Sequence, residues 1–353
     1  MSKMNVVLFC ENKYAIDILY PLYDYSKKMN YSVLWYIHTP KIPIDQFPWR
    51  NEVNYTSSIQ AVYDFAPDVI FVPGNIVPYY LPGVKVQVFH GYAAEKKDHW
   101  VIRRYFDLYL TQGPFFTRKF KELSRQYKDF EVIETGWTKQ DWIKQNLTTF
   151  EADKQALLKQ HNKEAIVLYA PTFSPSLSSL PTIKDELVQL ARKEDVVIII
   201  KLHPLTKAEW VAEYKALAND EPNIVWASEN NVTKYQLMSD LMISDTSSTV
   251  YEFLLLNRPV ITLKTIAKDI YWTNILEPSD LLRAYDIAVN DPDAIEKRQW
   301  VVENYDPYLD GKVCERMFEA VSQYIQVHGV PQERKLNLWR KYTSIKTFGK
   351  IKR

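Results

Sequence analysis

Short apolar runs alternate with amphipathic stretches along the whole chain. The runs are nearly continuous and rich in β-branched residues, most clearly VVIII at 196–200, which is typical of strands buried on both faces. Between them, apolar residues recur at three- and four-residue spacing, which predicts helices such as Tyr14–Met29, Lys207–Ala218 and Val313–Ile325. Strand–helix alternation of this kind predicts parallel α/β sheets. The expected strands are Asn5–Cys10, Ser32–His38, Val69–Val72, Lys85–Phe89, Leu108–Thr111, Glu131–Glu134, Ala165–Tyr169, Asp195–Lys201, Asn223–Trp226, Leu241–Ser244 and Pro259–Leu263.

The alternation occurs twice, and a polar, helix-prone stretch, Thr148–Lys163, separates the two halves as an expected linker. We therefore expect an α/β protein of two Rossmann-like domains whose parallel sheets face a central cleft. The expected divisions are 1–150 for the first domain, 151–330 for the second and 331–353 for a basic C-terminal tail. Ligands of open α/β sheets bind beyond the carboxyl ends of the strands, so the residues that follow the strands are the candidates for chemistry.

The 353 residues include 44 basic and 43 acidic side chains, and this balance argues against a protein devoted to nucleic acid. The two cysteines, Cys10 and Cys314, form no disulfide framework, which favours a reducing compartment. No apolar window approaches 18 residues and the first apolar run is too short for a secretory signal, so we expect a cytosolic protein without a membrane-spanning helix. With eight glycines, the chain also lacks the GxGxxG and GxxxxGK[ST] phosphate loops.

Histidine follows an expected strand in each half of the chain. His90 comes directly after Lys85–Phe89, and His203 comes after the strand that ends near Lys201. A solvated loop histidine is the simpler interpretation of either residue alone. Because the chain has only six histidines, two at corresponding strand ends favour a role as an acid or base near neutral pH, or as a hydrogen-bond donor to phosphate.

A run of hydroxyl-bearing residues follows another expected strand. The run Thr246–Thr249 comes after Asp245 and opens a predicted helix that carries Glu252 in its first turn. Helix capping alone explains one such residue. Four in a row favour a phosphate site made of hydroxyls and backbone N–H groups, without a glycine-rich loop.

Two further features lie near the C-terminus. Gly311 and Lys312 precede the expected helix Val313–Ile325 and are candidates for the same cleft. The tail Arg334–Arg353 holds eight Lys or Arg and no Asp or Glu, which indicates either a solvated tail or a segment attracted to anionic lipid. No His, Cys and Asp cluster with metal-ligand spacing occurs, so no metal site is predicted, although bound magnesium is compatible with the sequence.

Taken in order, these motifs resemble the CDP-glycerol glycerophosphotransferase family, the polymerases and primases of teichoic acid and capsule synthesis. The resemblance covers about 85–325. It rests on His90-Gly91 followed by Lys96-Lys97, on Tyr169-Ala170-Pro171-Thr172, on Lys201-Leu202-His203-Pro204, on Ile243-Ser244-Asp245-Thr246-Ser247-Ser248 with Tyr251-Glu252-Phe253, on Arg258-Pro259-Val260-Ile261, and on Asp310-Gly311-Lys312 with Arg316.

The resemblance implies a GT-B-like fold with an acceptor-side N-terminal domain and a nucleotide-donor C-terminal domain. The implied reaction transfers glycerol phosphate, or a related polyol phosphate, from a CDP-activated donor to a hydroxyl of a cell-envelope polymer or lipid-linked glycan, and releases CMP. CDP-glycerol or another CDP-polyol is then the donor substrate, with magnesium as an allowed rather than an implied ion. The expected location is the cytoplasm or the inner face of the cell membrane, with an anionic membrane surface as a further partner.

By the same resemblance, His90 is the general base on the acceptor hydroxyl and His203 contacts the donor phosphates. The implied donor-binding residues are Gly91, Thr172, Lys201, Pro204, Asp245, Thr246, Ser247, Ser248, Glu252, Gly311 and Lys312. The chain departs from the family pattern at Tyr92, where threonine is usual, and at Ser174, where arginine is usual. Thr246 stands where an aromatic residue is frequent.

Two other interpretations remain open. The first is a nucleotide-sugar enzyme of the same architecture, a glycosyltransferase or a relative of the UDP-sugar 2-epimerases. The epimerases usually have Ser-Gly-Gly where this chain has Thr246-Ser247-Ser248, which disfavours them. The second is a non-catalytic scaffold in an envelope-polymer assembly, for which His90 and His203 would be dispensable.

Overall fold

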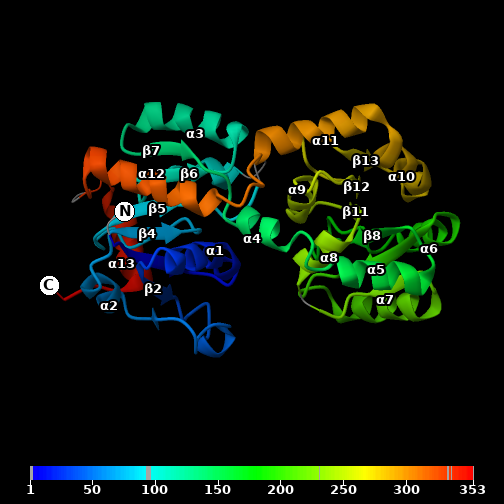
Figure 1. The fold of residues 1–353 in the computed structure, drawn as a ribbon, viewed down its shortest axis with the longest axis horizontal. Coiled ribbons are helices and arrows are strands. Elements are labelled where there is room, and N and C mark those ends of the chain that lie inside the picture. The colour runs from blue at the N-terminus through cyan, green and yellow to red at the C-terminus, as the bar shows by residue number, and fades with distance from the viewer. Residues whose placement is uncertain (1–2, 93–96, 230, 332–333, 335, 353) are drawn as a thin grey trace. The chain divides into compact units, whose positions relative to one another are not determined.

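A computed structural model describes residues 3–92, 97–229, 231–331, 334 and 336–352. The chain forms two α/β units, one made of Met1–Gln145 with Tyr305–Arg353 and the other of Asn146–Asn304 (Figure 1). Each unit contains one sheet of parallel strands with helices packed on it, which confirms the predicted fold class. Among the described residues, no helix has the length and apolar character needed to cross a bilayer.

The sheet of the first unit has the order β3-β2-β1-β4-β5-β6-β7. Its strands are β1 (Asn5–Cys10), β2 (Ser32–Ile37), β3 (Tyr55–Thr56), β4 (Val69–Val72), β5 (Val84–Gln87), β6 (Leu108–Thr111) and β7 (Glu131–Glu134). Val6–Phe9 of β1 and all of β4 and β5 are buried, as expected for strands covered on both faces. The strand order reverses between β1 and β4, and such a reversal opens a crevice at the carboxyl ends of the two strands.

The helices of the first unit come from both ends of the chain. They are α1 (Ala15–Lys28), α2 (Ile59–Asp64), α3 (Pro114–Tyr127), α4 (Lys139–Asn146), α12 (Val313–His328) and α13 (Leu338–Phe348), with 3-10 turns at Ile44–Gln46 and Lys97–Trp100. α12 packs beside α1, where Phe318 lies against Tyr25, Tyr31 and Phe71. A segment from the end of the chain therefore completes the core of the first unit.

The sheet of the second unit has the order β10-β9-β8-β11-β12-β13 and reverses between β8 and β11. Its strands are β8 (Ala165–Tyr169), β9 (Val196–Ile200), β10 (Ile224–Trp226), β11 (Leu241–Ser244), β12 (Val260–Leu263) and β13 (Thr273–Ile275). Its helices are α5 (Glu151–His161), α6 (Lys184–Lys193), α7 (Ala208–Asp220), α8 (Val232–Met238), α9 (Thr249–Leu254), α10 (Leu281–Asn290) and α11 (Pro292–Tyr305), with a 3-10 turn at Pro278–Asp280. Alternate strand residues such as Ile198 and Ile243 form one core with α6, α7 and α10.

The structure differs from the predicted division of the chain in two places. The stretch expected to be a linker contains α5, which packs on α8 and β8, so it belongs to the second unit. At the other end, the second unit stops at Asn304 instead of 330, because the following residues are bound to the first unit. The N–H groups of Val313 and Cys314 donate to the two carboxylate oxygens of Asp141, at 2.9 and 2.8 Å.

The basic tail also packs on the first unit. Arg334 forms an ion pair with the buried Asp107, with Nη2 and Oδ2 2.6 Å apart. Tyr80 donates to the carbonyl of Gly349, and the Phe348 ring packs edge-on against Phe9. Part of the tail is therefore ordered structure and not a solvated extension.

Candidate functional site

The carboxyl ends of β1 and β4, between which the strand order reverses, bring three loops of the first unit together. Glu11 directly follows β1, Pro73 and Gly74 directly follow β4, and His90 lies three residues beyond the end of β5. Because β1, β4 and β5 are adjacent and parallel, their carboxyl ends lie at one edge of the sheet. The predicted base His90 therefore lies beside the switch point of its sheet.

His90 is exposed, and its ring is oriented by a backbone carbonyl. The Nδ1 atom lies 3.0 Å from the carbonyl oxygen of Pro73. Since a carbonyl only accepts, Nδ1 carries the proton of the neutral ring and Nε2 holds the lone pair. The backbone next to it is unusual, because Phe89 has a φ of +56° and Gly91 has a φ of +146°. Left-handed backbone at a non-glycine residue costs free energy and is typical of functional loops.

The loop that holds His90 is itself fixed by buried polar groups. The Gln87 amide donates to the carbonyls of Pro73 and Gly74, at 3.1 and 2.8 Å. The carboxyl group of Glu11 accepts from the backbone N–H of Asn75 and lies so close to Gly74 that a Cβ there would be 1.7 Å from Oε1. Any side chain at Gly74 would thus displace Glu11. Gln87 and Glu11 both hold the loop after β4 in place, and the Pro73 carbonyl of this loop orients the His90 ring.

Glu11 was not among the sequence candidates. It is 5% exposed, and burial raises its pKa to about 7 against the opposing influence of Lys41 and the Asn75 N–H. Asn12 donates to Glu11 Oε1 at 3.4 Å and to the Tyr14 hydroxyl at 3.1 Å, and the Tyr14 ring lies 5.0 Å from the His90 ring. The signal that identified the histidines, a polar residue directly after a buried strand, was also present at Glu11.

Tyr92, which departs from the family pattern, is buried behind His90. Its hydroxyl donates to Asp306 Oδ2 at 2.7 Å, and the Trp137 N–H donates to the same oxygen at 2.9 Å. Burial raises the pKa of Asp306 to about 7, opposed by these hydrogen bonds. Tyr92 therefore attaches the His90 loop to the segment that precedes α12.

The second unit also assembles its candidates at the carboxyl edge of its sheet. Thr172, His203 and Asp245 follow β8, β9 and β11, which are neighbouring strands. Asp245 is fully buried, with Oδ1 accepting from the Thr172 N–H at 2.8 Å and Oδ2 accepting from the N–H and hydroxyl of Ser179 at 2.9 and 3.0 Å. Burial raises its pKa, and these hydrogen bonds oppose the rise. Asp245 thus positions the loop after β8, a role that the sequence did not separate from ligand binding.

His203 is exposed and has the opposite proton arrangement to His90. The backbone N–H of Leu205 donates to its Nδ1 atom at 3.1 Å, so the neutral ring carries its proton on Nε2. Burial and the charge of Lys201 lower its pKa, which favours the neutral ring. The Phe173 ring stacks on it at 4.4 Å between centroids. The loop after β8 therefore contacts Asp245, the residue after β11, through Thr172, and it contacts His203 through Phe173.

The hydroxyl run is only partly used for capping. α9 has six residues, and Ser248 at its N-cap position makes no side-chain capping bond. The Ser247 and Thr249 hydroxyls lie 2.8 Å apart, and Thr246 Oγ1 accepts from the N–H of Ile266 at 3.2 Å. The exposed Ser248 hydroxyl and the half-buried Thr246 hydroxyl remain able to donate to a ligand.

The remaining sequence candidates are distributed between the units. Lys201 is buried, its Nζ donating to the Leu202 carbonyl at 3.1 Å, and burial lowers its pKa. Pro204 is exposed in the turn after His203, and Glu252 is half-buried in α9. Gly311 and Lys312 belong to the first unit, before α12, whereas His203 belongs to the second.

Lys96 lies outside the described residues. Among the residues that are described, no three His, Cys, Asp or Glu side chains gather in a way that could hold a metal ion.

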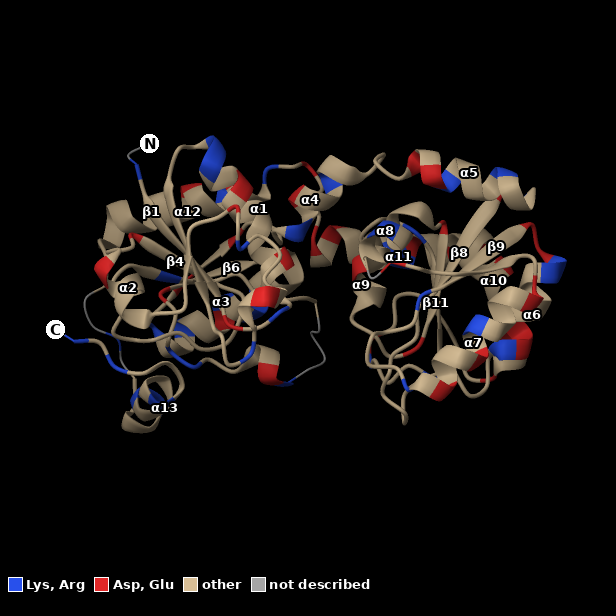
Figure 2. Ribbon diagram, turned by 90° about the horizontal axis from the view of Figure 1, so that it is seen from below, with Lys and Arg blue, Asp and Glu red and all other residues tan. Residues whose placement is uncertain are grey.

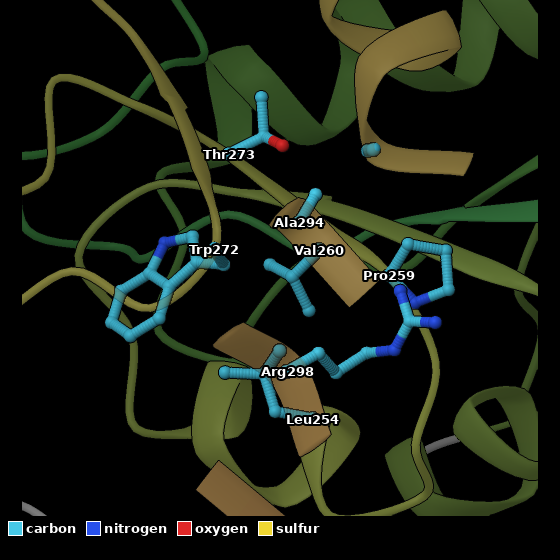
Figure 3. A pocket seen from close by; sticks show the side chains of 8 residues that line it. Leu254, Pro259, Val260, Trp272, Thr273, Ala294 and Arg298 are labelled. Atoms are coloured by element: carbon cyan, nitrogen blue, oxygen red, sulfur yellow. The ribbon is translucent and has the colours of Figure 1, made fainter. Parts of the chain in front are cut away.

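A small pocket lies in the second unit (Figure 3). It is lined by Leu254, Pro259, Val260, Trp272, Thr273, Ala288, Ala294 and Arg298. Pro259 precedes β12 and Thr273 begins β13, so the pocket borders the amino ends of these strands. Ligands of open α/β sheets bind at the carboxyl ends, and we therefore assign no substrate to this pocket.

Several known proteins with similar sequences are teichoic acid polymerases or primases. The family model described as CDP-Glycerol:Poly(glycerophosphate) glycerophosphotransferase matches residues 17–272. The teichoic acid poly(glycerol phosphate) polymerase of Bacillus spizizenii (strain ATCC 23059 / NRRL B-14472 / W23) is 21% identical over 255 residues, which cover 67% of this chain and 60% of that protein. The teichoic acid ribitol-phosphate primase of the same strain is 24% identical over 298 residues, covering 73% of this chain and 74% of that protein. The match to the ribitol-phosphate polymerase TarK of Staphylococcus aureus (strain NCTC 8325 / PS 47) covers 40% of that protein, so the chain spans about half the length of the polymerases.

Solved structures with the same fold include a structure of the wall teichoic acid polymerase TagF. It has a TM-score of 0.61 at 18% identity and covers 92% of this chain and 90% of that chain. A structure of S. aureus MnaA with UDP has a TM-score of 0.70 at 12% identity, covering 95% of this chain and 100% of that chain. These likenesses confirm the GT-B-like fold. Together with the family match over more than half of its length, they show that the chain belongs to the CDP-glycerol:poly(glycerophosphate) glycerophosphotransferase family.

Proposed function

We propose that the protein transfers a polyol phosphate, glycerol phosphate or ribitol phosphate, from a CDP-activated donor to a hydroxyl of a teichoic acid-type acceptor. CMP is the leaving group. The observation that supports this proposal most strongly is that the neutral rings of His90 and His203 carry their protons on different nitrogen atoms. One ring has a basic Nε2 and the other has a protonated Nε2, as a proton acceptor and a phosphate donor would require.

His90 acts on the acceptor in this proposal. As the acceptor oxygen attacks the phosphorus that bears the polyol, its proton moves to Nε2 of His90. The Nδ1–H···O bond to Pro73 then stabilises the imidazolium and keeps the ring in place. The bond from that phosphorus to the CMP oxygen breaks, and CMP leaves with the electron pair.

The second unit binds the donor in this proposal. His203 donates through Nε2 to a diphosphate oxygen, and Thr246 and Ser248 donate through their hydroxyls. Asp245 holds the loop after β8 close to the hydroxyl run, because it accepts from the Thr172 backbone N–H and directly precedes that run. Such hydrogen bonds stabilise the charge on the transferring phosphoryl group, which is the main demand of this chemistry.

The test is release of CMP from CDP-glycerol and from CDP-ribitol in the presence of a teichoic acid-type acceptor. We expect His90→Ala and His203→Ala each to lower the rate by about a hundredfold or more. His328→Ala in the first unit and His161→Ala in the second serve as matched controls, since both histidines lie at helix ends outside the site. Equal thermal stability of all four variants would show that folding is retained.

Other outcomes point to the alternatives. Full activity of both site variants would leave a scaffold role. Turnover of a UDP-sugar, with CDP-polyols inert, would indicate a nucleotide-sugar enzyme. The cheaper first measurement is thermal stabilisation by nucleotides, because a ligand bound by the native state alone raises apparent stability. We expect cytidine diphosphate derivatives to exceed uridine derivatives.

A further inference from the structure

Tyr14 lies beside the candidate base at the carboxyl edge of the first sheet. It occupies the N-cap position of α1, in the short loop that connects β1 to this helix. Its ring centroid lies 5.0 Å from that of His90, with 35° between the two ring planes, and the residue is 43% exposed. A substrate that reaches the exposed His90 ring therefore also approaches the Tyr14 side chain.

The Tyr14 hydroxyl is oriented by the neighbouring Asn12. The Asn12 side-chain amide donates to the phenol oxygen at 3.1 Å and to Oε1 of the buried Glu11 at 3.4 Å. A phenol that accepts a hydrogen bond still has its own O–H to donate, and this O–H has no acceptor within the described part of the chain. Burial raises the pKa of Tyr14 to about 12, Glu11 adds to the rise and the hydrogen bond from Asn12 opposes it, so the hydroxyl keeps its proton at neutral pH. Tyr14 thus presents an oriented donor to a ligand oxygen.

The exposed charges in the loops around this donor are basic. On helices such as α5 and α6, Lys and Arg stand close to Asp and Glu (Figure 2). In the loops that directly follow β1 and β2, by contrast, Lys13 and Lys41 are exposed whereas Glu11 is buried. The charge of Lys41 acts at this edge of the sheet, since it opposes the rise in the pKa of Glu11. Exposed cations beside a hydrogen-bond donor favour an anionic ligand.

We infer that Tyr14 binds the acceptor of the transfer reaction, with its hydroxyl donating to the phosphodiester oxygen nearest the attacking hydroxyl. A polyol phosphate chain carries its terminal hydroxyl only a few bonds from its last phosphodiester, so the two groups suit neighbouring side chains such as His90 and Tyr14. A hydrogen bond to a charged phosphodiester is stronger than one to a neutral oxygen. The inference rests on the proposed function and adds the class of acceptor, a chain that already ends in a polyol phosphate in preference to a sugar terminus.

The first experiment measures acceptor binding without any donor. An oligomer of glycerol phosphate is titrated into the full chain by calorimetry, and Tyr14→Phe should weaken its binding by about tenfold, because the hydrogen bond to a charged group is lost. Asn12→Ala should weaken it less, since the phenol remains but loses its orienting partner. The matched control is Tyr342→Phe, which alters a tyrosine that is 55% exposed on α13 and should bind the oligomer as the unchanged protein does.

The second experiment follows CMP release from CDP-glycerol at varied concentrations of each substrate. Tyr14→Phe should raise KM for the glycerol phosphate oligomer by about tenfold and leave kcat and the KM for CDP-glycerol unchanged, as expected for a contact made equally in the ground and transition states. With an acceptor that ends in a sugar and has no phosphodiester near its hydroxyl, Tyr14→Phe should behave as the unchanged protein. Far-UV circular dichroism and thermal unfolding check that each variant is folded.

Three results would overturn the inference. They are unaltered binding of the oligomer by Tyr14→Phe, an equal loss with the sugar-terminated acceptor, and a raised KM for CDP-glycerol, which would place Tyr14 on the donor instead. An unchanged protein that releases no CMP would contradict the proposed function. The calorimetric titration needs no turnover, so it decides on Tyr14 in that case as well.

Discussion

At the scale of single residues, a buried carboxyl group supports the candidate base. Glu11 occupies the switch point of the first sheet, and its Oε2 atom is buried with no hydrogen-bond partner among the described residues. A charged carboxylate without full hydrogen bonding is costly there, and this cost raises its pKa to about 7 from 4.5. The group that fixes the His90 loop therefore changes charge near neutral pH.

This titration makes stability depend on pH. Between pH 4.5 and 7 the folded protein holds the Glu11 proton and the unfolded chain has lost it, so the free energy of unfolding falls as pH rises through this range. From pH 5.5 to pH 8 the contribution amounts to about 2 kcal/mol. Glu11→Gln removes this contribution. Between pH 5.5 and pH 8 the free energy of unfolding of the variant, measured by urea unfolding, should therefore fall by about 2 kcal/mol less than that of the unchanged protein.

The control for this prediction is Glu122→Gln, because Glu122 is exposed on α3. This helix is not part of the loops that follow β1, β4 and β5. Its pH dependence should match that of the unchanged protein. Asp306, also buried with a pKa raised to about 7, titrates in both variants, so some dependence persists. Identical curves for Glu11→Gln and the unchanged protein would show that Glu11 stays charged in the folded state.

At the scale of elements, one helix is capped by a residue far away in the sequence. Asp141 in α4 accepts from the first two N–H groups of α12, the helix of Val313–His328. Lys312, at the N-cap position, makes no side-chain capping bond itself. A carboxylate at a helix N-terminus satisfies free N–H groups and interacts favourably with the helix dipole. Asp141 therefore joins two segments that the sequence pattern assigned to different domains.

Asp141→Ala should destabilise the first unit by about 1 to 2 kcal/mol, because it leaves two buried N–H groups without partners. The loss is measured by urea unfolding with fluorescence detection. Asp293→Ala, at the exposed start of α11, is the control and should cost less than about 0.5 kcal/mol. Similar losses in the two variants would mean that the cap adds little to helix docking.

The strands were predictable from the sequence because each is a local apolar run. β1, β4, β8 and β11 occur within the predicted bounds, and so do the polar residues after them. The two histidines were likewise found from local order. What the local pattern could not show is which distant groups meet, such as Asp141 with α12 or Asp245 with Ser179. Helix α5 was mistaken for a linker because its exposed face is polar, while only Leu158 is buried.

At the scale of the whole molecule, the two units differ in how the chain builds them. The second unit is one continuous stretch, Asn146–Asn304, with its own sheet and core. The first unit needs two stretches, since Phe318 of α12 fills its core and Arg334 pairs with the buried Asp107. Asp107 also accepts from the backbone N–H of Lys85, so the pair lies at the amino ends of the neighbouring strands β5 and β6.

This difference predicts how fragments behave. A fragment of residues 146–304 should fold alone, with cooperative thermal unfolding and dispersed amide signals in an NMR spectrum, because the core of its sheet is complete. A fragment of residues 1–145 should remain largely unfolded, since it lacks α12 and leaves Asp107 buried without its arginine, a loss of about 3 to 5 kcal/mol. Adding residues 305–353 as a separate chain should restore its fold. A cooperatively folded 1–145 fragment would mean that the C-terminal segment only covers the first unit, and an unfolded 146–304 fragment would mean that the second unit depends on the first.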